Sequence, residues 1–90
     1  MNIVNEIIQV NGRVQGVGFR YATQSTAISL GLNGYVCNKP DGSVYIEVEG
    51  TKEQIAVFIV WCKKGPSRAI VQEVRHFSGP LMNYQSFRIR

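Results

Sequence analysis

Hydrophobic and polar positions alternate most regularly in residues 43–49. Every second residue of this stretch is aliphatic, namely Val44, Ile46 and Val48. Such alternation predicts a strand of a sheet with one buried face. A second apolar stretch at residues 35–38 precedes it, and the four residues 39–42, Lys-Pro-Asp-Gly, form a strong turn signal between the two. The sequence therefore predicts a β-hairpin.

A helix is predicted after this hairpin. Residues 51–54, Thr-Lys-Glu-Gln, have the form of a capping box. The apolar residues that follow are spaced i, i+3, i+4 and i+7, as on one face of a helix, namely Ile55, Phe58, Ile59 and Cys62. Lys63 and Lys64 suit a helix C-terminus, and the next two residues, Gly and Pro, cannot easily continue it.

Another helix is predicted at residues 20–32, which contain no proline. Gly31 and Gly34 mark its end. The apolar residues expected to form its buried stripe are Tyr21, Ala22, Ala27, Ile28 and Leu32.

Three further strands complete the pattern, at residues 4–10, 69–77 and 86–89. In the last of them, Phe87 and Ile89 are expected to face inward. The order β-α-β-β-α-β, followed by a last strand piece, predicts a ferredoxin-like α+β sandwich in which two helices cover one face of an antiparallel sheet. Ninety residues have room for one such unit, so residues 1–90 are interpreted as a single domain.

The composition is that of a globular protein, with 44% hydrophobic and 18% charged residues. The chain lacks an apolar run long enough to cross a membrane, and its N-terminus has neither the basic nor the apolar segment of a leader peptide. We therefore expect a cytoplasmic protein without a membrane partner. The net charge of +4 is concentrated in residues 51–90, which carry seven basic and two acidic residues. This bias suits anionic partners, including phosphorylated small molecules and nucleic acid.

Cysteine and histidine suggest neither a metal site nor a redox motif. Cys37 and Cys62 lack Cys-x-x-Cys spacing and have no histidine close by in sequence, so we expect reduced thiols and no metal. His76 is the only histidine and lies in a predicted strand beyond the glycine-rich segment, which favours a structural role.

The residues with the clearest chemistry lie at 12–20, the run GRVQGVGFR between the first strand and the first helix. Three glycines free the backbone to bend, so that amide groups at the positive end of the helix can converge on an anion. The planar guanidinium of Arg20 can bind two oxygens of a phosphate. Neither a Walker A loop nor a dinucleotide fingerprint is present. The alternative is a tight connection in which Arg20 is an ordinary solvated side chain.

Asn38 is the second candidate, because its amide can fix the orientation of a water molecule without titrating. Its alternative role is to stabilise the turn that follows it. From the residues alone, both readings stay open.

These two segments resemble the signatures of the acylphosphatase family. The first is residues 12–20, and the second is residues 34–44, GYVCNKPDGSV, closed by Gly50. The Gly-Pro pair at residues 65–66, followed by Ala69 and Val71, is similar to a later part of the family pattern, so the resemblance covers essentially the whole chain. Cys37 stands where family members often carry a longer or basic residue, and strand alternation turns it away from Asn38.

The resemblance implies a metal-independent, cofactor-free enzyme that hydrolyses the carboxyl-phosphate bond of acyl phosphates to a carboxylate and inorganic phosphate. It implies a monomer that binds no nucleic acid. Arg20 and Asn38 would be catalytic, Asn38 by positioning the attacking water. The substrate phosphate would be held by Arg20 and by the backbone amides of Gln15, Gly16, Val17, Gly18, Phe19 and Arg20.

Two other functions are considered. Ferredoxin-like sheets with aromatic and basic residues can bind single-stranded RNA, but residues 44–47, Val-Tyr-Ile-Glu, are acidic where such a module needs basic residues. The aromatic residues Tyr35, Tyr45, Phe77 and Phe87 are therefore interpreted as packing residues. The chain is also compared with acylphosphatase-like modules of larger maturation enzymes, which would bind without hydrolysis. The intact Arg20 and Asn38 favour turnover.

Overall fold

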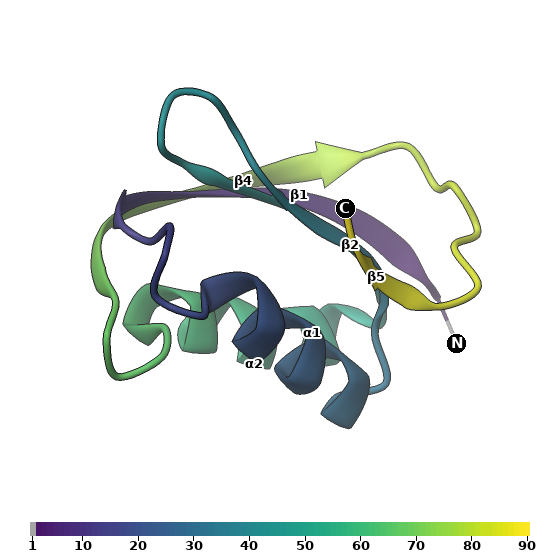
Figure 1. Ribbon diagram of the computed structural model, residues 1–90. Coiled ribbons are helices and arrows are strands. Elements are labelled where there is room, and N and C mark those ends of the chain that lie inside the picture. The colour runs from purple at the N-terminus through teal and green to yellow at the C-terminus, as the bar shows by residue number, and fades with distance from the viewer. Residues whose placement is uncertain (1) are drawn as a thin grey trace.

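The computed structural model describes residues 2–90 and contains the predicted elements in the predicted order (Figure 1). The elements are β1 (Val4–Arg13), α1 (Phe19–Ser29), β2 (Asn33–Asn38), β3 (Val44–Gly50), α2 (Lys52–Lys64), β4 (Ile70–Gly79) and β5 (Phe87–Ile89).

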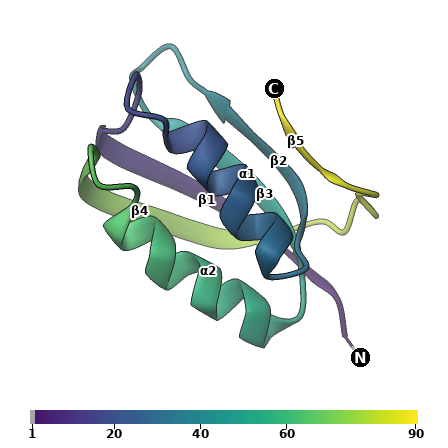
Figure 2. The ribbon, with the colours of Figure 1, turned by 60° about the horizontal axis from the view of Figure 1, so that its bottom comes forward.

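The five strands form one sheet in the order β4-β1-β3-β2-β5. The pairs β4–β1, β1–β3 and β3–β2 are antiparallel, whereas the short β5 pairs parallel with β2 and makes the sheet mixed. Both helices lie against the same face of the sheet (Figures 1 and 2). The predicted ferredoxin-like α+β fold is confirmed, and β5 is the last strand piece that extends it.

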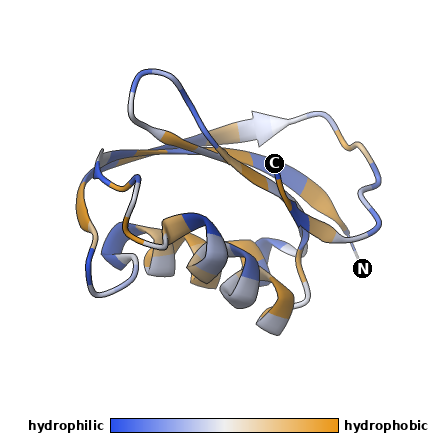
Figure 3. Cartoon of the chain, in the orientation of Figure 1, coloured by the Kyte–Doolittle hydropathy of each residue, from blue (hydrophilic) through white to orange (hydrophobic). Residues whose placement is uncertain are grey.

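The hydrophobic core fills the space between the sheet and the helices, where the apolar segments of both layers face each other (Figure 3). The predicted alternation of β3 is confirmed, because Val44, Ile46 and Val48 are fully buried. Ile46 pairs with Ile8 of β1 on one side and with Val36 of β2 on the other. Burial of each such side chain contributes about 1.5–3 kcal/mol. The inner face of the sheet therefore supplies the surface on which α1 and α2 pack.

Helix α2 begins as its sequence predicts. The Thr51 hydroxyl accepts a hydrogen bond from the Gln54 amide at 3.2 Å, and the Gln54 side chain accepts one from the Thr51 amide at 2.8 Å. Two of the backbone donors that open the helix are thereby paired. The four predicted core residues of this helix are all buried.

The buried stripe predicted for α1 is partly wrong. Tyr21 is 73% exposed and Ile28 is 60% exposed. The helix begins at Phe19, and its buried residues Phe19, Thr23 and Ala27 are spaced by four positions. Tyr21 lies two positions beyond Phe19, about 200° around the helix, so it points away from the core.

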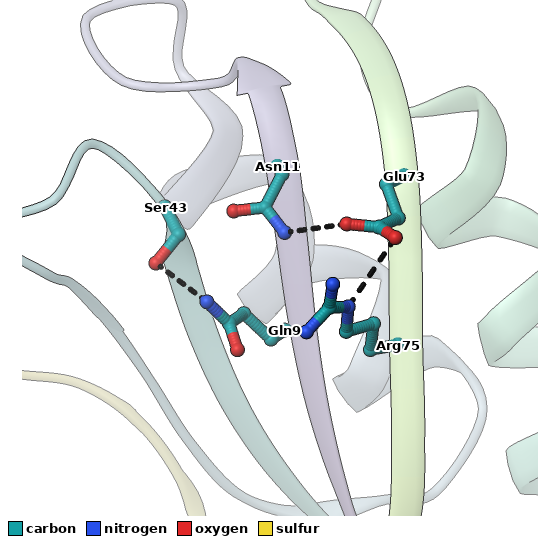
Figure 4. A network of polar contacts seen from close by, with 5 residues as sticks. All are labelled: Gln9, Asn11, Ser43, Glu73 and Arg75. Atoms are coloured by element: carbon teal, nitrogen blue, oxygen red, sulfur yellow. Dashed lines mark hydrogen bonds and ion pairs between the residues drawn. The ribbon is translucent and has the colours of Figure 1, made fainter.

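The outer face of the sheet is not covered by helices, and several polar side chains lie on it (Figure 4). Gln9 donates to the Ser43 hydroxyl at 3.4 Å, and Asn11 donates to Glu73 at 3.3 Å. Arg75 pairs with Glu73 at 3.2 Å. Within residues 2–90, no helix is both long and apolar enough to cross a membrane.

Candidate active site

The connection between β1 and α1 takes its shape from two glycines. Gly16 has φ 74° and Gly18 has φ 79°, and Gly18 is the N-cap of α1. This left-handed conformation strains a residue with a side chain, whereas glycine adopts it freely. A Cβ atom placed on either residue would meet no atom within 4 Å. The requirement for glycine is therefore conformational, and the space in front of the loop is open.

Buried side chains hold this loop in place. Val14, Val17 and Phe19 are at most 8% exposed, and they alternate with the exposed residues Gly16 and Gly18. The Phe19 ring also lies 5.5 Å from the Trp61 ring of α2. Apolar anchors therefore fix the loop from the core side, and its glycine backbone faces outward.

The backbone donors of this loop have no partner within the described chain. The backbone amides of residues 15–20 donate no hydrogen bond to another group of residues 2–90. Helix α1 has no side-chain cap at its N-terminus and no acidic residue in its first turn. Unpaired amides at the positive end of a helix form a binding site for an anion.

The hairpin turn between β2 and β3 is closed by residues other than Asn38. Asp41 accepts hydrogen bonds from the Ser43 amide at 2.9 Å and from the Ser43 hydroxyl at 2.6 Å. These two bonds hold the pKa of the Asp41 carboxyl below its usual value. The Lys39 amide also donates to the Ser43 carbonyl at 2.9 Å. The Asn38 side-chain oxygen therefore takes no part in the hydrogen bonds that close this turn.

The Gln15 side chain joins the loop to this turn. Its amide nitrogen donates to the Lys39 carbonyl at 2.8 Å and to the Ser43 carbonyl at 2.9 Å. The sequence predicted a role only for the backbone of Gln15, so this contact was missed. The two bonds fix the distance between the loop and the residue that precedes Lys39, which is Asn38.

Asn38 lies at the end of β2, on the inner side of the sheet. It pairs with the buried Val44, whereas Cys37 pairs with Tyr45 and faces the other way, as alternation predicts. The Asn38 Oδ1 atom is buried and has no hydrogen-bond partner among residues 2–90. Only two other buried side-chain oxygens in this part of the chain share that property, those of Asn5 and Thr23.

A pocket of about 230 Å³ lies between the loop and Asn38. Arg20 is the one cationic side chain among the described residues that line it. Gln15 and Val17 do not line it, because their side chains contact the hairpin turn and the core. Neither Asn5 nor Thr23 reaches it. Its lining consists of Val14, Gly16, Gly18, Phe19, Arg20, Tyr21, Asn38 and Ile89.

The other residues considered in the sequence lie elsewhere. His76 Nδ1 is 2.7 Å from the Glu6 carboxylate on neighbouring strands β4 and β1. Cys62 is a free thiol in the core, and burial raises its pKa. In the stretch from Asn2 to Arg90, no group of three or more His, Cys, Asp and Glu side chains is arranged to hold a metal ion.

These features define an α+β sandwich with a pocket, lined by Arg20, at the junction of its first strand and first helix. The Acylphosphatase family model matches residues 6–89. An acylphosphatase of Trichormus variabilis is 52% identical over 65 residues, which cover 72% of this chain and 64% of that relative. The chain belongs to the acylphosphatase family.

Solved structures show the same relationship. An acylphosphatase from Coxiella burnetii superimposes with a TM-score of 0.96 and 32% identity, covering 99% of this chain and 94% of that one. Full-length HypF, in its phosphate- and nucleotide-bound form, contains a matching region with a TM-score of 0.90 and 33% identity. That match covers 99% of this chain but 12% of HypF, so the fold occurs both alone and inside a larger protein.

Proposed function

We propose that this protein hydrolyses acyl phosphates to a carboxylate and inorganic phosphate, without a metal or another cofactor. Family membership supports the activity. The observation that carries the mechanism is the Asn38 amide oxygen, which is buried, unpaired and adjacent to the pocket lined by Arg20 and the start of α1. A buried polar atom without a partner costs about 1–3 kcal/mol, so its retention beside an open pocket indicates a ligand.

The phosphate of the substrate occupies the pocket in front of the loop. The backbone amides of residues 15–20 donate to its oxygens, and the Arg20 guanidinium neutralises its charge. In the transition state, negative charge is spread over the three equatorial phosphoryl oxygens, where fixed donors stabilise it most. The loop is suited to this role because its buried anchors hold the donors in place before substrate binds.

Asn38 holds the attacking water. Its side-chain oxygen accepts a hydrogen bond from the water. This hydrogen bond orients the water so that a lone pair of the water oxygen points toward phosphorus. The oxygen of the water forms a bond to phosphorus while the bond from phosphorus to the acyl oxygen breaks, and the bonding electrons leave with the carboxylate. The two water protons pass to phosphate and solvent. A carboxylate is a good leaving group, so the reaction needs no acid to protonate it.

Labelled water tests both the activity and the position of attack. Purified protein is incubated with benzoyl phosphate and excess EDTA in water enriched in oxygen-18. We expect hydrolysis far above the uncatalysed rate, with the label in inorganic phosphate. Label in benzoate instead would show attack at the carbonyl carbon and would contradict the roles given to Arg20 and Asn38. Loss of activity with EDTA would contradict the metal-free mechanism.

The absence of any hydrolysis would favour the second candidate, a domain that binds phosphate without turnover. The observation that favours this second candidate is the match of the chain to one part of HypF. Binding of inorganic phosphate, measured by calorimetry, would then separate a binding module from a protein without an anion site.

We further propose that the protein is a cytoplasmic monomer, that it acts on a small molecule, and that it binds neither nucleic acid nor membrane. The outer face of the sheet supports the part on nucleic acid, because Tyr35 and Tyr45 both donate to the Glu47 carboxylate there. A carboxylate at the centre of this face repels a phosphate backbone. Light scattering and RNA retention at physiological salt test these points.

A further inference from the structure

The side chain of Gln15 reaches from the loop to the hairpin turn without lining the pocket. It is half-buried, and its amide group has two hydrogen atoms to donate. One is donated to the Lys39 carbonyl at 2.8 Å and the other to the Ser43 carbonyl at 2.9 Å. A side chain with both donors engaged therefore connects the segment proposed to hold the phosphate with the segment that follows Asn38.

These two bonds are the hydrogen bonds that join the loop to the turn among the described residues. The pairing of β1 with β3 ends at Val10 and Val44, so the sheet ladder stops before it reaches either segment. Both segments also contain glycine in the left-handed conformation, as in Gly42 of the turn with φ 94°. The distance between the loop and the turn is therefore set at this point by the Gln15 side chain.

The turn does not need the Gln15 side chain to satisfy its carbonyl groups. The Lys39 carbonyl also accepts from the Gly42 amide at 3.1 Å, and the Ser43 carbonyl also accepts from the Lys39 amide at 2.9 Å. Loss of the Gln15 side chain would thus leave neither carbonyl without a partner, and we expect a small change in stability. Closure of the turn does not account for the contact.

We propose that the Gln15 side chain is a positioning group, which sets the distance between the phosphate on the loop and the water on Asn38. This inference rests on the proposed function. In-line attack requires the water to lie close to phosphorus and opposite the leaving oxygen, and a misplacement of about 1 Å can lower the rate about 100-fold. Asn38 directly precedes Lys39, so a shift of the turn moves the water relative to the loop.

The first test is the Gln15→Met variant, which keeps the length of the side chain and the backbone amide but removes both donors. With benzoyl phosphate as substrate, kcat should fall about tenfold, because the water is less well placed. Inhibition by inorganic phosphate should stay within about twofold, and the Tm should change little, because the buried anchors of the loop are intact. A rise in the inhibition constant as large as the fall in kcat would overturn the inference.

The matched control is Gln9→Met, the same substitution in β1. Gln9 donates to the hydroxyl of Ser43 at 3.4 Å, whereas Gln15 donates to the carbonyl of that residue, and Gln9 lies outside the pocket lining. This variant should keep kcat within about twofold. An unchanged kcat in Gln15→Met, or an equal fall in Gln9→Met, would contradict the positioning role.

A double-mutant cycle identifies the group through which Gln15 acts. Gln15→Met should lower kcat about tenfold in the wild-type protein but no more than about twofold in the Asn38→Ala background, where no water is held. A role confined to the fold or to the phosphate loop would lower kcat equally in both backgrounds. Equal losses would therefore overturn the inference while leaving the proposed function intact.

Absence of hydrolysis by the wild-type protein would remove the proposed function, and orthovanadate would then decide the inference. Vanadate can add an apical oxygen from water, so its binding reports the spacing between the phosphate and the water, whereas phosphate reports the loop alone. Calorimetry should show that vanadate binds more tightly than phosphate and that this preference falls about tenfold in Gln15→Met. A preference that is absent from the wild-type protein, or unchanged in the variant, would rule out the positioning role.

Discussion

Two polar regions lie at opposite ends of the sheet, and they differ in whether their hydrogen-bonding groups have partners. At the end with the loop and the hairpin turn, the backbone amides of residues 15–20 and the side-chain oxygen of Asn38 have no partner among the described residues. At the other end, the buried Glu49 accepts from Asn5 at 2.9 Å, from the Met82 amide at 2.6 Å and from the Tyr84 amide at 2.9 Å. These bonds tie the segment after β4 to the sheet.

Glu47 continues this paired region. Its carboxylate accepts from the hydroxyls of Tyr84 at 2.7 Å, Tyr45 at 2.8 Å and Tyr35 at 3.2 Å. Burial alone would raise the pKa of Glu47, but the tyrosine hydroxyls outweigh it and lower that pKa. Burial and the same hydrogen bonds raise the pKa values of Tyr45 and Tyr84.

The difference separates stability from function. Paired carboxylates lower the free energy of the folded state, whereas unpaired amides cost stability and are retained where a ligand pairs them. Variants at the unpaired end should therefore lose activity and keep their stability. Variants at the paired end should lose stability and keep their activity.

The largest effect is expected from Arg20→Ala. It removes the only cation lining the pocket in the described chain, and kcat/KM for benzoyl phosphate should fall about 10³-fold. Steady-state kinetics measure the change, and thermal unfolding should show an unchanged Tm. Arg68→Ala is the matched control, since Arg68 is exposed and lies outside the pocket lining. Full activity in Arg20→Ala would contradict the role of Arg20 in binding the substrate phosphate.

Asn38→Ala should lower kcat about 10²-fold, because one positioned hydrogen bond to the reacting water is lost. Inhibition by inorganic phosphate should stay within about twofold, since the loop and Arg20 are intact. The Tm should not fall, because the substitution removes a buried oxygen that has no partner. A Tm lowered by several degrees would instead show that Asn38 supports the turn.

At the paired end, Glu49→Gln should lower the free energy of unfolding by about 2 kcal/mol. The new amide group presents donors to backbone amides that are themselves donors. Urea unfolding measures the loss, and activity at a temperature well below Tm should remain. Glu73→Gln is the control, because Glu73 is an exposed partner of Arg75 and its loss should cost less than about 1 kcal/mol.

The smallest effect concerns the pH dependence of stability at Glu47. Its pKa in the folded protein lies below the 4.5 of an exposed glutamate. The charged form therefore stabilises the fold above about pH 4.5, and this contribution is lost as the pH falls through the lower, folded pKa. Unfolding free energies between pH 7 and pH 3 should decline less steeply in Glu47→Gln than in the wild-type protein. Parallel curves would show that the tyrosine contacts do not favour the carboxylate.

The sequence predicts the fold well where one physical signal is strong. The alternation in β3 and the capping box of α2 specify their elements and buried faces without tertiary information. The stripe of α1 was partly wrong. Ala27 and Leu32 are buried as predicted, but Tyr21 and Ile28 are exposed, because nothing local distinguishes a large apolar residue of the core from one on the surface. The actual stripe uses Thr23 and Ala27, whose small size suits close packing against the sheet.

The candidate site was predictable in its residue types but not in its connections. The glycines and Arg20 predict a loop suited to an anion, and the structure brings Arg20 and Asn38 to one pocket. The side-chain bonds of Gln15 to Lys39 and Ser43 depend on how β1, β3 and β2 are arranged, which no local pattern records. The same holds for Ile89, which reaches the pocket only because β5 pairs with β2.

The bridge made by Gln15 has a consequence for folding. The loop follows β1 in the chain, and the hairpin turn directly precedes β3. The two hydrogen bonds of Gln15 can therefore form only after these strands have paired in the correct register. A slip of one residue would turn the inner face of β3 outward and separate the two halves of the site. In refolding, catalytic recovery should therefore follow the slow, long-range pairing of strands and not the early formation of helices. The recovered enzyme activity would therefore measure the fraction of molecules whose strands are paired in the correct register.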